Sequence, residues 1–209
     1  GYPKSYARDD IPKIDHYPDG QTTPSPSAIN FKPGELLGSV SGELGLRKFL
    51  EKAGHTVLDC PMSGTGAQAA VKDLVVYASG DSAAIARLQP MFLGFARKVH
   101  DLGAYGNGSK MKFVANHLVA IHNVAAAEAM VLAMKAGLDP HQTVEVIGSG
   151  AGTSRMFELR APMMARNHYL PATMRSSTWK KDMTVIGDFA SDLSCPTPLF
   201  DISATLYTS

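Results

Sequence analysis

The sequence has little net charge, few cysteines and no long apolar run, and each shortage excludes a class of protein. Lysine and arginine (20 residues) nearly balance aspartate and glutamate (19 residues), and basic residues come at most in pairs. The chain therefore has no basic patch of the kind that follows a nucleic-acid backbone. No uninterrupted apolar run reaches the roughly 18 residues of a membrane span. We expect neither a nucleic-acid nor a membrane partner.

Cysteine and histidine are also too sparsely placed to suggest disulfides or metal sites. Cys60 and Cys195 are the two cysteines, and they are far apart with no C-x-x-C spacing. This pattern predicts reduced thiols in a cytoplasmic protein. The histidines form no H-E-x-x-H motif and no cluster with cysteine, so we expect no metal site.

The first 45 residues differ from the rest of the chain. Prolines crowd the segment from Gly1 to Pro33, and turn-type residues separate them without apolar periodicity. A segment with many prolines and low hydrophobicity cannot bury enough surface to offset its ordering entropy. We expect residues 1–45 to form an extended or disordered arm.

The remainder reads as an α/β remnant, residues 46–102, followed by an all-α domain, residues 103–209. Strands are predicted at 56–59, 74–79 and 98–102, and helices at 46–53 and 83–93, the latter capped by Asp81 or Ser82. One long central helix is predicted from 107 to 136 and closed by Gly137. The helices expected to surround it span 140–147, 156–164, 174–193 and 197–207.

The start of the long helix carries the first candidate site. Gly106 and Gly108 let the chain turn into a helix whose free N–H groups can face an anion. Lys112 and Asn116 are four residues apart and so share one helix face, where an ammonium and a carboxamide can orient one substrate oxygen. An isolated K-x-x-x-N pair is more often a solvated lysine beside a surface asparagine.

A second candidate site follows the predicted strand 56–59. After Pro61, the run Ser63-Gly64-Thr65-Gly66 offers hydroxyls and unhindered backbone N–H groups. Such a loop can hold a carboxylate without a cationic side chain. The alternative is an ordinary strand-ending turn.

These two segments resemble the motifs of the β-hydroxyacid dehydrogenase family, which includes 3-hydroxyisobutyrate dehydrogenase. The family pattern G-x-G-x-x-x-K-x-x-N-N is matched by Gly106, Gly108, Lys112 and Asn116, with Ala115 in place of the first asparagine. The run from residue 57 to 65 is similar to the family's F-L-D-A-P-V-S-G-G. Downstream, three family glycines are replaced and a methionine is changed; these positions are Gln68, Lys72, Ser79 and Tyr77.

A third motif, Lys181-Asp182-Met183, is similar to the family's K-D-L. On its own, a Lys-Asp pair usually belongs to a solvated surface. The three motifs occur in the family order, and the resemblance runs from about Arg47 to Tyr207. Its helical half is also similar to the C-terminal domain of 6-phosphogluconate dehydrogenase.

The resemblance implies NAD- or NADP-dependent oxidation of a short β-hydroxy acid. It makes Lys112 the acid/base and Asn116 the group that orients the substrate. It assigns the substrate carboxylate to Ser63, Gly64 and Thr65. It places Lys181 at the cofactor and substrate cleft, with Asp182 supporting it.

One family feature is missing, and its absence leaves a rival interpretation open. No G-x-G-x-x-G motif occurs before Arg47, so the chain reads as a truncated or rearranged family member with most of its dinucleotide site absent. The alternative is a non-catalytic helical module for dimerisation or partner binding. A sheet with so few strands leaves an unpaired edge, so we expect a homo-oligomer. The substrate and the choice between NAD and NADP stay open.

Overall fold

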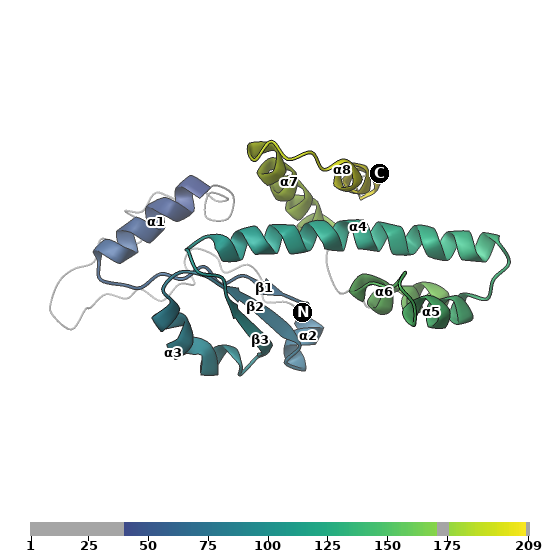
Figure 1. The fold of residues 1–209 in the computed structure, drawn as a ribbon, viewed down its shortest axis with the longest axis horizontal. Coiled ribbons are helices and arrows are strands. Elements are labelled where there is room, and N and C mark those ends of the chain that lie inside the picture. The colour runs from purple at the N-terminus through teal and green to yellow at the C-terminus, as the bar shows by residue number, and fades with distance from the viewer. Residues whose placement is uncertain (1–39, 171–175, 208–209) are drawn as a thin grey trace. The chain divides into compact units, whose positions relative to one another are not determined.

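The structure is a computed structural model that describes residues 40–170 and 176–207 (Figure 1). The described residues belong to two units, which are divided between Lys48 and Phe49. The first described element, α1, spans Val40–Lys52 and so begins before the predicted start at residue 46. Gly42 and Gly45 are poor helix formers, which is why the sequence pattern placed the start after them. The rest of the predicted arm, residues 1–39, lies outside the described residues.

The second unit opens with a small mixed sheet in the order β1-β2-β3. Strand β1 (Met62–Ser63) is antiparallel to β2 (Leu74–Ala78), and β2 is parallel to β3 (Ala96–Asp101). Between them lie α2 (Gly66–Ala70) and α3 (Ser82–Phe92). The predicted strand at 56–59 was wrong in extent: only Asp59 pairs, through a single bridge to Ser79.

The apolar core of the sheet is formed by β2, whose side chains alternate between buried and half-buried, and by α3, the helix that follows it. Leu74, Val76 and Ala78 are buried on β2, while the residues between them are half-buried, as expected for a strand with one face in the core. They pack with Ile85 and Phe92 of α3. Asp81 caps α3 by accepting a hydrogen bond from the Ala84 amide at 2.6 Å, as its sequence position predicted.

After β3 the described residues form helices only. The long helix α4 runs unbroken over 29 residues, Asn107–Lys135, which confirms the prediction of one continuous helix. It packs against each of the later helices and against β2 (Figure 1). These helices are α5 (Pro140–Gly148), α6 (Arg155–Ala165), α7 (Ser176–Asp192) and α8 (Pro198–Leu206).

Two apolar clusters hold the later helices on α4. Around Ala120, a first cluster joins α4 to Trp179 and Met183 of α7 and to Phe200 of α8. Nearer the C-terminal end, Met130 packs with residues of α6 in a second cluster. The long helix is therefore the element on which α6, α7 and α8 assemble.

Much of α4 is nevertheless left uncovered. An 18-residue window of this helix has a mean hydropathy of 1.4, enough by length and composition for a membrane-crossing helix, yet only 22% of the window is buried. Met111, Leu118 and Leu132 are 42%, 47% and 72% exposed and lie 7 and then 14 residues apart on one helix face, with Val114 beside them. We call these four residues the α4 stripe.

Candidate functional site

The helix that carries Lys112 begins against the ends of the sheet strands. Gly106 is its N-cap and has a φ of +92°, a left-handed conformation that favours glycine. The Asn107 side chain donates to the Leu102 carbonyl at 2.8 Å, just after β3. The Gly108 amide donates to the Ser79 hydroxyl at 3.0 Å, just after β2. The start of α4 is thus fixed to two neighbouring strands.

The anion that faces the first turn of α4 is the chain's own Asp59 carboxylate. It accepts the Ser109 amide at 2.8 Å and the Ser109 hydroxyl at 2.7 Å. It also accepts the Ser79 hydroxyl at 3.0 Å. The sequence predicted that these N–H groups could face an anion, and a negative side chain at this position complements the helix dipole. This turn is therefore occupied by an internal partner.

Gly108 is required for this close approach. A Cβ atom at this position would lie against the Tyr77 carbonyl oxygen, 2.8 Å from the Asp59 carbonyl oxygen and 3.0 Å from the Asp59 carboxylate. Backbone oxygens cannot move aside as a flexible side chain can. The second glycine of the motif therefore lets the helix touch the strand ends, and it does not leave a space for a ligand.

One turn further along α4, Lys112 is half-buried and shares its helix face with Asn116. Burial lowers the pKa of the Lys112 amine below its ordinary value, and the negative charge of Asp182 on α7 partly opposes this shift. The structure thus brings three of the predicted site residues into one region. A neutral amine is stabilised there relative to water, as a proton acceptor requires.

The other lysines near the motifs have a different setting. Lys110 is exposed, although it lies only two residues from Lys112. Lys181 is also exposed, whereas its neighbour Asp182 is half-buried, and the charge of Asp182 raises the pKa of Lys112. The resemblance assigns Asp182 to the support of Lys181, and in the structure its negative charge also acts on the Lys112 amine.

The predicted carboxylate loop sits between β1 and α2. Ser63 pairs with Val75 through the backbone, and its hydroxyl makes no hydrogen bond within the described part of the chain. Gly64 has a φ of +130°, and a Cβ there would meet the Leu74 side chain at 2.5 Å. The Thr65 amide and hydroxyl both donate to the Gln68 side-chain oxygen, at 2.9 and 3.3 Å. Within the described residues, no hydrogen bond joins this loop to Lys112 or Asn116.

The three residues that replace family glycines each take up a definite role. Lys72 keeps the left-handed backbone of a glycine, with a φ of +57°. Ser79 uses its hydroxyl to link Asp59 with the α4 amide of Gly108. Gln68 bonds Thr65 and also donates to Asp73 at 3.0 Å. Two of the three replacements, Gln68 and Ser79, thus add side-chain hydrogen bonds to this region.

Sequence reasoning missed Asp59, Ser79 and Ser109 as a group, because the contacts between them span 20 to 50 residues. The signal for Asp59 was its place at the end of an apolar segment, directly before the loop. Ser109 carried the usual signature of a helix start, a small hydroxyl residue in the first turn. Nothing local indicated that these residues would meet.

Two family models match the chain. One is described as the NAD-binding domain of NADP-dependent 3-hydroxyisobutyrate dehydrogenase and matches residues 106–209. The other is described as the NAD-binding domain of 6-phosphogluconate dehydrogenase and matches residues 40–103. Between them they include every predicted site residue. Residues 1–39 lie outside both matches.

Individual relatives agree with the family models. An L-threonate dehydrogenase from Cupriavidus necator is 36% identical over 179 residues, which are 83% of this chain and 60% of that enzyme. The crystal structure of a 3-hydroxyisobutyrate dehydrogenase from Salmonella typhimurium superposes with a TM-score of 0.72 at 32% identity, over 81% of this chain and 60% of that one. The chain thus spans about three fifths of the length of these two proteins.

A shorter match has a different character. A formate dehydrogenase from Pseudomonas sp. is 76% identical over 58 residues, which are 28% of this chain but only 14% of that enzyme. The identity is high, yet so small a share of the enzyme brings no activity with it. The motifs around Lys112 and Ser63 are accounted for by the two family models.

Proposed function

Because the chain belongs to the 3-hydroxyisobutyrate dehydrogenase-like β-hydroxyacid dehydrogenase family, we propose that it acts in the NAD(P)-dependent oxidation and reduction of a short β-hydroxy acid. The observation that supports this most is the half-buried Lys112, whose pKa is lowered by burial beside Asn116. Perturbed groups of this kind are typical of sites that move protons.

In this proposal Lys112 accepts the hydroxyl proton during oxidation and returns it to the carbonyl oxygen during reduction. The first step needs a neutral amine, which burial favours, and the second needs an ammonium, which the nearby Asp182 favours. Asn116 on the same helix face orients the substrate oxygen by hydrogen bonding. L-threonate and 3-hydroxyisobutyrate, the substrates named for the relatives, are the first compounds to test.

The carboxylate of the substrate is assigned to the loop that follows β1. The Ser63 hydroxyl has no partner among the described residues and is available to donate. Gly64 has no side chain of its own over its backbone N–H group, although Leu74 fills the space on its Cβ side. Thr65 is the third assigned residue, although its amide and hydroxyl are engaged by Gln68. We therefore place the main carboxylate contacts on Ser63 and Gly64, with Thr65 shaping the loop.

NAD(P) is the cofactor of the matching domains, and it supplies the hydride acceptor of the reaction. The described residues do not provide a cradle for its pyrophosphate. These residues contain one β-α-β unit, β2-α3-β3. The Asp81 carboxylate caps the start of its helix α3, so a negative charge lies where a phosphate would need hydrogen-bond donors. Lys181 stays the candidate for contact with the cofactor at the substrate cleft, with Asp182 supporting it.

We further propose that a second copy of the chain covers the α4 stripe. Met111, Leu118 and Leu132 are spaced at multiples of seven residues along one face, and such a spacing lets two identical helices pack against each other. In this view residues 103–209 are an all-α substrate and dimerisation domain, and residues 46–102 are a remnant of the dinucleotide domain.

Sedimentation at micromolar concentration tests this association. We expect a dimer or larger oligomer for the wild-type chain and dissociation by Leu118→Glu. The control is Leu199→Glu, which adds the same charge at an exposed leucine on α8. A monomeric wild-type chain would contradict the proposal.

The rival function is a non-catalytic dimerisation or partner-binding module, which the absence of a pyrophosphate cradle among the described residues favours. Calorimetric titration with NAD(H) and NADP(H), followed by turnover assays with L-threonate and 3-hydroxyisobutyrate, separates the two. Binding and turnover support the dehydrogenase proposal. A folded chain that binds no nucleotide and turns over neither acid favours the module.

A further inference from the structure

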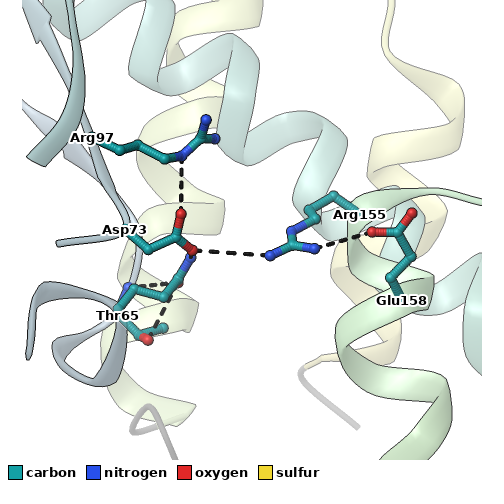
Figure 2. A network of polar contacts seen from close by, with 6 residues as sticks. Thr65, Asp73, Arg97, Arg155 and Glu158 are labelled. Carbon is teal, nitrogen blue, oxygen red and sulfur yellow. Dashed lines mark hydrogen bonds and ion pairs between the residues drawn. The ribbon is translucent and has the colours of Figure 1, made fainter. Parts of the chain in front are cut away.

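A chain of polar contacts runs from α6 to the carboxylate loop, and Asp73 is at its centre. Figure 2 shows the Asp73 carboxylate, in the turn before β2, facing two arginines. It lies 2.9 Å from Arg97 on β3 and 3.9 Å from Arg155, the first residue of α6. It also accepts the Gln68 side-chain amide at 3.0 Å. One carboxylate therefore joins β3, α2 and α6.

Gln68 connects Asp73 to the carboxylate loop. Its nitrogen donates to Asp73, so its oxygen is turned toward Thr65 and accepts both the Thr65 amide and the Thr65 hydroxyl. A carboxamide has a donor end and an acceptor end, and its partners decide which end points where. An ionised Asp73 carboxylate has no donor and can only accept hydrogen bonds. It therefore selects the nitrogen end of the Gln68 carboxamide and fixes the orientation of that side chain. The Gln68 hydrogen bond is also the main cause that lowers the pKa of Asp73, with the two arginines adding to it.

Gln68 stands where the family motif has glycine. A glycine there would leave the Thr65 amide and hydroxyl without this partner. The oxygen of Gln68 would also lie 3.4 Å from a Cβ at Gly64, so it is in van der Waals range of the loop, beside the closer Leu74 side chain. In this chain, Gln68 thus supports the loop through two hydrogen bonds from Thr65.

We propose that Asp73 is a positioning residue for the carboxylate loop: it orients Gln68, which fixes Thr65, and its contact with Arg155 links the loop to α6. The role rests on the proposed function of Ser63 and Gly64. Asp73 itself does not touch the substrate. Arg155 is 64% exposed and is also paired with Glu158 at 3.1 Å, so its contribution is the smaller one and is screened by salt.

Hydrogen exchange of the Thr65 amide, followed by NMR on the full chain, tests the linkage without any need for activity. One hydrogen bond is worth about 0.5–1.5 kcal/mol, so losing its support should raise the exchange rate about 2- to 12-fold. We expect this rise in Gln68→Ala and in Asp73→Ala, with partial recovery in Asp73→Glu. Arg155→Ala should give a smaller rise, visible at low salt only. Arg87→Ala removes an exposed arginine of α3 and should change nothing.

An unchanged Thr65 exchange rate in Asp73→Ala overturns the proposal, and so does a rise in Gln68→Ala alone. In an active chain, Asp73→Ala should raise the KM for L-threonate severalfold and leave kcat within about twofold, because the loop binds the substrate and does no chemistry. Equal losses in kcat would contradict a positioning role. An inactive wild-type chain that shows the expected exchange pattern refutes the proposed function but supports the linkage.

Discussion

Asp59 holds the first turn of α4 through Ser109, accepting both its amide and its hydroxyl within 2.8 Å. Asp59→Ala would leave the Ser109 amide and hydroxyl without their acceptor, while the Ser79 hydroxyl would keep its contact with the Asp59 backbone carbonyl at 3.2 Å. Unsatisfied buried donors cost about 1–3 kcal/mol, so we expect a loss of unfolding free energy in that range. Urea denaturation measures it, with the exposed Asp192→Ala of α7 as the control. Equal stability of the two variants would show that Asp59 is not an anchor.

Gly108, beside this anchor, and Gly187 should respond to alanine with stability changes of opposite sign. In Gly108→Ala, the added methyl would press against backbone oxygens of Tyr77 and Asp59, and overpacking of this kind costs about 1–3 kcal/mol. Gly187 in α7 has nothing within 4 Å of its Cβ direction. Gly187→Ala should therefore stabilise the protein by about 0.5–1 kcal/mol. Thermal unfolding of both variants checks the two signs.

The assignment of Lys112 rests on its register along α4. If the chain oxidises a hydroxy acid, Lys112→Ala should lose about 10²–10⁴-fold in kcat, the usual contribution of an acid/base group. Lys110→Ala removes an exposed lysine two residues away and should change the rate little. Steady-state kinetics with L-threonate compares them. Similar losses in the two variants would show that the role of Lys112 does not depend on the helix face that it shares with Asn116.

The pH dependence of the reaction should follow the Lys112 amine. Oxidation needs the neutral amine, so its rate should rise with pH through a pKa that burial holds below the ordinary lysine value. Reduction needs the ammonium and should fall over the same range. Asp182 raises this pKa, so Asp182→Asn should move the limb for oxidation to lower pH. A limb that stays in place, or moves upward, would contradict the pairing of these residues.

The long helix could be predicted from sequence because its signals are local. The run from Asn107 to Lys135 contains no proline and only Gly108 near its start, and the predicted bounds differ from the observed ones by a single residue. The shared face of Lys112 and Asn116 followed from helical periodicity alone. Their burial, and the charge of Asp182 against Lys112, depend on how α7 packs and had no local signal.

The sheet was harder to predict. Thr56 to Asp59 has strand-like composition, yet only the bridge between Asp59 and Ser79 forms there, and pairing continues after Pro61 at Met62–Ser63. Tertiary contacts decided the outcome, because Asp59 is drawn to the start of α4. Gln68 and Ser79 were read as departures from a glycine motif. Their hydrogen bonds could not be foreseen from composition.

The anchor at Asp59 also places Lys112 close to a pivot. With a rise of about 1.5 Å per residue, α4 is about 43 Å long, and Lys112 is only about 6 Å from Gly108. If the helix rocked by about 10° about its anchored end, its far end would travel about 7 Å while Lys112 moved about 1 Å. In such a motion the end that carries Lys112 would stay nearly in place, and the far end, against which α5 and α6 pack, would move the most.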